Sequence, residues 1–226
     1  MTCWPVAIAS AMGLTWAQLW LVRHHPEPDP AEPDARHKPR YADLITRRVW
    51  LLAIPATLAA LIPLPVLPDW RWPGWVVWSS AVAVLIWVDA RSTWWPIRAS
   101  RFAEWTMALA VVGAALLTEG NWWSPILGAL LGASAAGAMF AIFWWLTGAL
   151  GFGDVRLAAL LGALTGMADL TSWSLSLLAG ALLALCWGLV TIAWRRYRPS
   201  PLGRTFAYGP GLWLGAHAGL AWTLLG

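Results

Sequence analysis

Long apolar stretches separated by short polar segments run along the whole chain. Eight of these stretches approach the roughly 20 residues that cross a bilayer core of about 30 Å, and we expect each to be a helix. The third, fourth and sixth are short for a span, so we expect their ends to extend into the flanking loops. The pattern predicts an all-α bundle of about eight membrane-spanning helices, at Cys3–Val22, Val49–Leu67, Trp75–Val88, Ala103–Leu117, Ser124–Leu150, Val155–Leu170, Trp173–Trp194 and Pro210–Leu225.

The composition indicates that the chain is solvated by lipid rather than by water. Apolar residues make up 59% of the 226 positions and charged residues only 12%. This leaves too little polar surface to cover a soluble globule. The 21 Trp residues gather near the ends of the predicted spans, for example at Trp72, Trp75, Trp94 and Trp95. Amphipathic rings settle at the headgroup level, so we expect them to anchor the bundle.

Positive charge falls almost entirely on one side of the predicted spans. Of the 15 Lys and Arg residues, only Arg71 belongs to the opposite side. Cytoplasmic loops concentrate Lys and Arg, so we expect these loops in the cytoplasm and both termini outside. The net charge of +4 then reflects orientation, and no basic stripe with exposed aromatic residues suggests a nucleic-acid partner. The cytoplasmic set is Arg23, Arg36, Lys38, Arg40, Arg47, Arg48, Arg91, Arg98, Arg101, Arg156, Arg195, Arg196, Arg198 and Arg204.

The sequence predicts two parts, which divide after the second span. Residues 1–72 form two N-terminal spans joined by this loop, between Arg23 and Arg40. Its many prolines and scattered charges predict an extended cytoplasmic segment without a core. Residues 73–226 form a core of six spans, which carries the candidate chemistry.

No residue pattern points to a metal or another cofactor. His24, His25 and His37 lie in the Pro-rich loop without a carboxylate or cysteine arrangement that would fix a coordination geometry. Cys3 and Cys186 lie in different predicted spans, with no CxxC spacing. We therefore expect a protein without a metal site.

Two carboxylates stand out because ionisable groups beside a hydrocarbon core are costly and usually functional. Asp89 ends the third predicted span, and Asp154 opens the sixth in the sequence Gly151-Phe152-Gly153-Asp154. The predicted topology puts both at the cytoplasmic edge of the bilayer. The other acidic residues belong to the first loop or to span ends, among them Glu104, which we expect to serve a helix N-terminus.

Two facing carboxylates can hydrolyse a peptide bond. They cannot both ionise cheaply, so the pair shares one proton. The ionised partner takes a proton from the attacking water, while the protonated partner stabilises the oxyanion and helps the amine to leave. Gly151 and Gly153 lack a Cβ atom, so the chain can turn sharply there and a substrate backbone can approach Asp154 closely.

Three motifs together resemble those of the prepilin leader peptidases, a family of GxGD membrane aspartyl proteases. The first is the sequence from Asp89 to Pro96, Asp-Ala-Arg-Ser-Thr-Trp-Trp-Pro. The second is the GxGD motif itself, followed by a basic residue, Arg156. The third is the aromatic-Gly-Pro sequence Tyr208-Gly209-Pro210, which opens the last helix in that family. The resemblance covers the chain from about residue 75 onward.

The resemblance implies an aspartic endopeptidase of the bacterial inner membrane that works without a cofactor. Asp89 and Asp154 would be catalytic on the cytoplasmic side. The substrate would be a pilin, pseudopilin or Flp pilin precursor, cut after a glycine that separates a short basic leader from an apolar helix. Gly151 and Gly153 would belong to the active-site loop, and Arg156 or the loop arginines would pair with acidic groups of the substrate.

Two departures from the family pattern affect the details. The family usually places Asp or Asn after the proline of the first motif, whereas Ile97 and Arg98 follow Pro96 here. Leader docking is therefore expected to differ. Bifunctional members carry two CxxC pairs in the first cytoplasmic loop, which has no cysteine in this chain. Cleavage is therefore expected without the accompanying N-methyltransferase activity.

Three alternatives stay open on the sequence. A rhomboid-like serine protease would use Ser134 with His217, although the motif Gly132-Ala133-Ser134-Ala135 lacks its final glycine. A presenilin-type protease would need a tyrosine before Asp89, where Val88 stands. A transporter or an assembly scaffold would use its intramembrane acids to carry protons or to pair with neighbouring arginines.

Overall fold

The protein is all-helical in the computed structural model, which describes residues 4–27, 39–198 and 206–225; no strand occurs in these ranges. The predicted all-α class is confirmed. In chain order the elements are α1 (Trp4–Arg23), α2 (Tyr41–Leu44), α3 (Arg47–Ala60), η2 (Leu64–Val66), η3 (Asp69–Arg71), α4 (Trp72–Val77), η4 (Trp78–Val82), α5 (Ala83–Ser92), α6 (Ile97–Leu117), α7 (Trp123–Thr147), α8 (Phe152–Gly166), α9 (Leu170–Tyr197) and α10 (Gly209–Leu225).

Six helical segments are long and apolar enough to cross a membrane, as expected of a multi-pass membrane protein. The other two predicted spans correspond to α8, with 15 residues, and α10, with 17. At the helical rise per residue these are roughly 22 and 25 Å long, shorter than a hydrocarbon core of about 30 Å. The number of eight spans therefore stays a prediction. The six segments are Trp4–Arg23, Arg47–Val66, Asp69–Ser92, Ile97–Leu117, Trp123–Thr147 and Leu170–Tyr197.

The ends of the short predicted spans differ in outcome. The third lengthens into the continuous segment Asp69–Ser92, which includes the π-helical turn η4, and the fourth begins earlier, at Ile97. The sixth begins earlier than predicted, at Phe152, but it ends at Gly166 instead of Leu170, which is the first residue of α9. The reason is Asp169, whose carboxylate accepts the N–H of Ser172 at 2.7 Å and so caps the start of α9.

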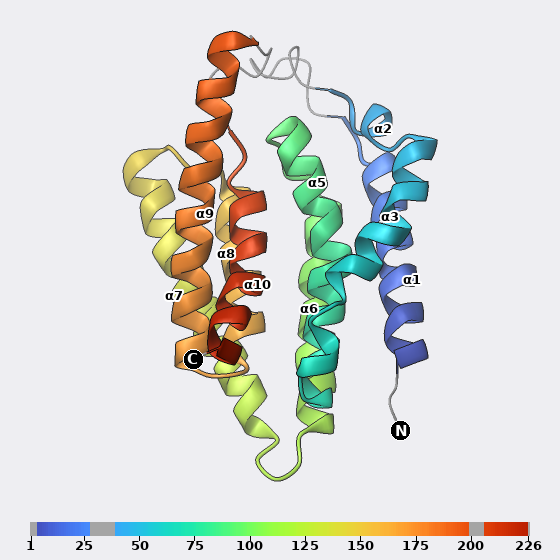
Figure 1. Ribbon diagram of the computed structural model, residues 1–226, viewed down its shortest axis with the longest axis vertical. Helices are drawn as coiled ribbons and strands as arrows, with labels where there is room; N and C mark the ends of the chain where they lie inside the picture. Colours follow the sequence, from blue (N-terminus) through green and yellow to red (C-terminus); the bar gives the residue numbers. More distant parts are fainter. Residues whose placement is uncertain (1–3, 28–38, 199–205, 226) are drawn as a thin grey trace.

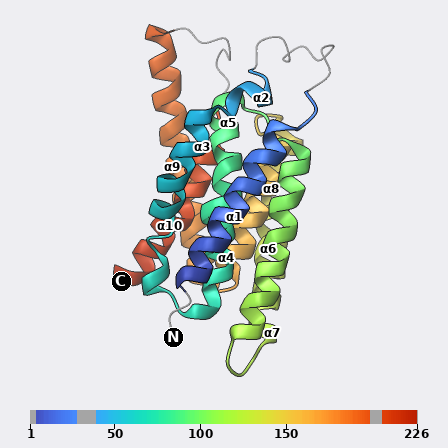
Figure 2. The ribbon, with the colours of Figure 1, turned by 90° about the vertical axis from the view of Figure 1, so that its right-hand side faces the viewer.

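Consecutive long helices run in alternating directions and form two groups, with α7 to α10 in one and α1, α3, α5 and α6 in the other (Figure 1). The groups meet where α5 packs on α10 and where α6 packs on α7 and α8. Figure 2 shows α1 crossing between α3 and α6, and α1 also packs against α4 and η4. The predicted division at residues 72 and 73 falls at the start of α4, inside this bundle.

Small residues that recur four positions apart, such as Gly128 with Gly132 and Gly211 with Gly215, bring two helix pairs into close contact. Gly132 of α7 lies against Gly162 of α8, where an added Cβ on either would collide with the carbonyl oxygen of the other. In the second pair, Gly215 of α10 lies against Gly180 of α9, with an added Cβ only 2.5 Å from the Gly180 Cα. The backbones therefore touch, and no side chain could be inserted there without moving a helix.

The arginine-bearing helix ends gather at one end of the bundle, drawn at the top in Figure 1. There α1, α5 and α9 end, and α3, α6 and α8 begin. The side of the membrane that this end faces stays a prediction. Most of the Pro-rich loop lies outside the described residues, together with Arg36, Lys38 and Arg204. The arginines on these helix ends are Arg23, Arg47, Arg48, Arg91, Arg98, Arg101, Arg156, Arg195 and Arg196.

Some tryptophans expected as interfacial anchors belong to the core instead. Trp72 and Trp75 are only 7% and 1% exposed, so they fill the bundle interior. In the sequence they lie where a predicted span begins, which suggested an interfacial position. In the structure α1 and α6 pack over this part of α4 and bury both rings. Trp123 of α7, by contrast, is 57% exposed and agrees with an anchoring position.

Candidate active site

Asp89 lies one turn before the end of α5, with only 7% of its surface exposed. The helix ends because Thr93 adopts a left-handed conformation, with φ of 54°, which is rare for a β-branched residue. The Thr93 N–H donates to the Asp89 carbonyl oxygen at 2.7 Å and closes the last turn. Backbone strain of this kind is typical of functional turns. The chain then reaches Pro96, which caps the start of α6.

Asp154 lies at the third position of α8, directly after the turn that follows α7. Gly148 ends α7 in the left-handed region, with φ of 60°, and Gly151 caps the start of α8. The Gly151 N–H donates to the Asp154 Oδ2 atom at 2.9 Å, which is one half of a capping box. Asp154 lies outside the six candidate spans, and burial raises the pKa of its carboxyl from 3.8 to about 6.

The start of α10 reaches Asp89 directly. The Gly209 N–H donates to the Asp89 Oδ2 atom at 3.0 Å, across 120 residues of sequence. A Cβ atom on Gly209 would lie 2.5 Å from the same oxygen, so only glycine lets the helix start approach this closely. Tyr208 stacks on Phe206 with ring centres 4.9 Å apart. The third sequence motif therefore contacts the first.

Asp89 and Asp154 line the same cavity, of about 630 Å³. The cavity lies where the end of α5, the turn before α8 and the segment before α10 meet. Gly151, Gly153 and Tyr208 also line it. Its described lining contains three carboxylates, those of Glu27, Asp89 and Asp154, and no Lys or Arg. The wall therefore favours a cationic or neutral ligand over an anionic one. The lining residues from the loop and turn segments are His25, Pro26, Glu27, Thr93, Trp94, Trp95, Gly148, Ala149, Leu150, Phe206 and Ala207.

A polar network ties the start of α6 to the start of α8. Trp95 packs directly over Gly153, where an added Cβ would lie 2.7 Å from the Trp95 Cβ. The Trp95 Nε1–H donates to the Ser100 Oγ atom at 2.7 Å, and the Ser100 hydroxyl donates to Glu104 at 2.8 Å. Arg156 completes the network, 3.2 Å from Glu104. The two aspartate-bearing turns are thereby held in a fixed relation.

This network changes the roles expected of two charged residues. Glu104 is the eighth residue of α6, too far from the helix start to serve its N-terminus, and its partner is Arg156. Arg156 was expected to face substrate acids, but it pairs with Glu104 and lies over the Phe152 ring, outside the lining of the cavity. Pro210, the second residue of α10, lines a different cavity from the one that contains the two aspartates.

Residues of the first loop complete the cavity, which the sequence did not indicate. His25 and Glu27 had been expected in a solvated segment. Glu27 instead accepts the Tyr41 N–H at 3.1 Å, and the Nε2 atom of His25 accepts the Arg98 N–H at 3.4 Å. Both side chains line the cavity beside the aspartates. In the sequence, the only hint was that His25 and Glu27 follow closely after the end of the first helix. Such closeness does not determine where a loop folds.

The serine and histidine of the rhomboid-like alternative are in different environments. Ser134 lies on the exposed face of α7. His217 of α10 packs between the rings of Trp75 and Trp213, and its Nδ1 atom is hydrogen bonded to the Trp213 carbonyl. No hydrogen bond joins the two within the described residues, and neither lines the cavity with the aspartates.

No protein family, curated protein or solved structure matches this chain.

Proposed function

We propose that this protein is an intramembrane aspartic endopeptidase of the prepilin peptidase type. Its substrate class is a pilin, pseudopilin or Flp pilin precursor, from which it removes the short basic leader at the cytoplasmic face of a bacterial inner membrane. The observation that carries this proposal is the position of Asp89 and Asp154 on one cavity, although they lie in separate helices and separate sequence motifs.

The surroundings of the two carboxylates support different roles in one dyad. Asp154 has a pKa raised to about 6 by burial, so it suits the partner that carries the shared proton. Asp89 then acts as the base that takes a proton from water, and Asp154 protonates the leaving amine. The Gly209 N–H fixes the Asp89 carboxylate by a hydrogen bond to its Oδ2 atom.

The location of the cavity fits a substrate that arrives from the arginine-rich end of the bundle. The end of α5 and the start of α8 both belong to that end (Figure 1). By the positive-inside tendency this end is cytoplasmic, with eight passages of the chain and both termini outside. A basic leader also complements the carboxylates of the cavity wall, to which Glu27 contributes.

The test is the co-expression of this protein with a precursor that has a basic leader, a glycine and an apolar run of about 20 residues. Leader removal is followed as a mobility shift on a gel. Wild-type protein is expected to process the precursor, and Asp89→Asn and Asp154→Asn each to leave it intact. The matched control is Asp169→Asn, at the cap of α9, because asparagine is an equally good cap. Normal processing by both active-site variants rules the proposal out.

The alternative is a transporter or an assembly scaffold in which the acids have no hydrolytic role. It is favoured by the fact that each aspartate accepts a backbone N–H at a helix start, as a purely structural cap would. A pairing between Asp154 and Arg156 is not supported, because Arg156 pairs with Glu104. In this case both asparagine variants keep the caps, and no precursor is cleaved even by wild-type protein.

Substituting Gly209 by alanine tests the contact between α10 and Asp89. The new Cβ would displace the Asp89 carboxylate, 2.5 Å away, rather than a backbone. We expect the cleavage rate to fall by about a hundred-fold, since misplacement of about an ångström has this effect on oriented groups. Thermal unfolding should change little. Gly113→Ala, whose Cβ meets only Pro73 at 3.6 Å, is the control, and equal rates for the two variants contradict the assigned role.

The network around Glu104 predicts a graded response to substitution. Glu104→Ala removes the acceptor for Ser100 and the partner of Arg156, so α6 and α8 are no longer tied. We expect kcat to fall by about ten-fold to a hundred-fold, with KM changed less, because Glu104 positions the turn and does not touch the substrate. Glu104→Gln keeps the acceptor and should retain most of the activity. Equal kcat values for Glu104→Ala and wild-type protein would show that the network does not position Asp154.

A further inference from the structure

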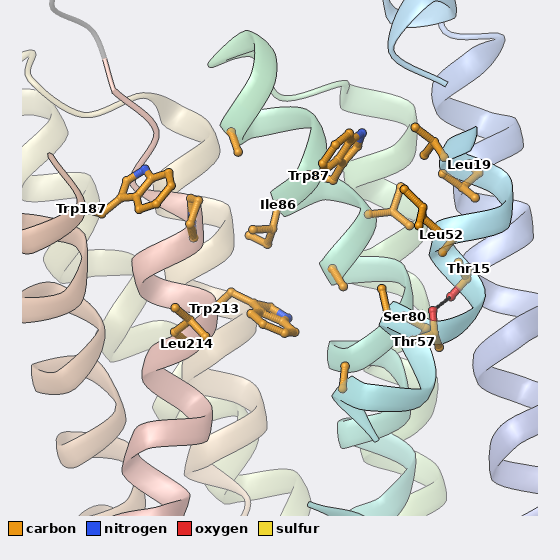
Figure 3. Close-up of a pocket in the computed structure, with 18 residues that line it drawn as sticks. Thr15, Leu19, Leu52, Thr57, Ser80, Ile86, Trp87, Trp187, Trp213 and Leu214 are labelled. Atoms are coloured by element: carbon orange, nitrogen blue, oxygen red, sulfur yellow. Dashed lines mark hydrogen bonds between the residues drawn. The ribbon is translucent and has the colours of Figure 1, made fainter. Parts of the chain in front are cut away.

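A second cavity, of about 460 Å³, lies between α3 and α5 on one side and α9 and α10 on the other (Figure 3). Its wall is almost entirely apolar. Leu52, Trp187 and Leu214 line it and are 64%, 44% and 45% exposed, so the cavity opens sideways, to the surroundings of the helices. In a bilayer these surroundings are acyl chains.

One polar group of this wall has no acceptor. The Trp87 Nε1–H is buried and makes no hydrogen bond within the described residues. Trp213, across the cavity in Figure 3, donates its own Nε1–H to the Trp78 carbonyl at 3.1 Å. A buried donor without an acceptor is costly and calls for a missing partner. The orphan is a donor, so the partner must supply an oxygen or another acceptor.

Positive charge lies at the same end of the cavity as Trp87. The Arg91 guanidinium lies over the Trp87 ring, 4.4 Å from its centre, and is exposed. On the facing helix, α3 begins with Arg47 and Arg48, directly before Val49, which lines the cavity. The cavity therefore combines an apolar wall with a cationic rim at the arginine-rich end of the bundle.

We propose that this cavity is a binding site for an anionic phospholipid. One acyl chain lies along the apolar wall. The Trp87 Nε1–H donates to an ester or phosphate oxygen, and Arg91 faces the phosphate, with Arg47 and Arg48 adding to the preference for negative charge. An acyl chain in a bilayer is already out of water, so the hydrophobic effect does not favour its transfer into the cavity. The headgroup contacts therefore decide which lipid binds.

The size of the cavity favours a lipid chain over a polypeptide helix. A membrane-spanning helix about 10 Å wide and 30 Å long occupies roughly 2,400 Å³, several times the volume available. A single flexible chain needs no such space. The site is separate from the proposed proteolysis, although Ile86 and Ala90 of its wall flank Asp89 in α5.

Photolabelling in a bilayer tests the site. The full-length protein is reconstituted in phosphatidylcholine nanodiscs with a minor fraction of phosphatidylglycerol that carries a diazirine in one acyl chain. After irradiation, labelled peptides are mapped by mass spectrometry. We expect labels to concentrate on the cavity segments of α3, α5 and α10, above the level on the exposed face of α7. Asp154→Asn protein should be labelled like wild type, which separates this test from that of proteolysis.

Two variants and their matched controls sharpen the result. Arg91→Gln should reduce labelling in the cavity by about five-fold, as expected for one cation near an anionic headgroup, whereas Arg101→Gln on α6 should not. Ala83→Leu fills the cavity and should bring labelling there to the background level, unlike Ala135→Leu on the exposed face of α7. Trp87→Phe removes only the donor and should give an intermediate loss.

Three outcomes overturn the proposal. Labels spread evenly over the exposed faces of α6 and α7 indicate annular lipid alone. Equal labelling by a diazirine phosphatidylcholine, unaffected by Arg91→Gln, removes the preference for an anionic headgroup. Displacement of the label by an apolar helical peptide of membrane-spanning length assigns the cavity to a polypeptide.

Discussion

Asp154→Asn protein is expected to cleave a pilin-like precursor at least about a thousand-fold more slowly than wild-type protein in detergent or nanodiscs. Asparagine keeps the size of the side chain. Its amide oxygen can still accept the Gly151 N–H, which in the wild-type protein lies 2.9 Å from the Asp154 Oδ2 atom. It cannot transfer a proton to the leaving amine. The measurement is single-turnover cleavage of purified precursor, in which chemistry is separated from product release.

The stability of this variant provides the control. The folded-state pKa of Asp154 is raised from 3.8 to about 6, so its contribution to stability is fully present below pH 3.8 and is lost as the pH rises through about 6. At pH 8 the wild-type carboxylate is ionised at a cost that a neutral amide does not bear. We therefore expect Asp154→Asn protein to unfold at the same or a higher temperature than wild type at pH 8, with the gain absent near pH 4.

Asp89→Asn should give the same loss of activity for a different chemical reason. The amide oxygen can still accept the Gly209 N–H, so the start of α10 stays in place, but the side chain cannot act as a base. A rate within ten-fold of wild type for either variant contradicts a shared catalytic role. Loss of activity together with a lowered unfolding temperature in both variants would instead attribute the lost activity to a disturbed fold.

The two aspartates could be singled out from the sequence because charged residues are rare in the apolar segments of a chain that lipid surrounds. A carboxylate such as Asp89 is easy to recognise because it interrupts a long run of apolar residues. The same holds for the small-residue spacing, since Gly128 and Gly132 lie four residues apart on one face of α7, and Gly162 and Gly166 lie four residues apart on one face of α8. Both signals are local, and local signals are what a single sequence carries.

Contacts between distant side chains had no such signal. Glu104 and Arg156 are ordinary charged residues near helix starts, and only the packing of α6 against α8 makes them partners. The cavity position of Glu27 likewise depends on how the first loop folds back toward Tyr41. The end of α8 was also missed: the predicted sixth span ran to Leu170, whereas Asp169 caps a new helix that begins at Leu170.

Gly162→Ala is expected to destabilise the protein by about 3 kcal/mol or more. The new Cβ would collide with the Gly132 carbonyl oxygen and would lie 2.7 Å from its carbon, so the obstacle is backbone and cannot rotate away. α7 and α8 would have to separate. In lipid this loss is not offset, because close van der Waals packing is the main attraction between these helices.

Gly13→Ala is the matched control, since an alanine Cβ there meets nothing within 4 Å in the middle of α1. It should be neutral or more stable by roughly 0.5–1 kcal/mol, because alanine favours the helix. Thermal unfolding in detergent, followed by helical circular dichroism, compares the two. Gly132→Ala disturbs the same contact, so the double variant should lose less than the sum of the single losses. Additive losses, or equal unfolding temperatures for Gly162→Ala and Gly13→Ala, would show that α7 and α8 do not meet through these glycines, and Asp154 would then lose the support that α7 gives to α8.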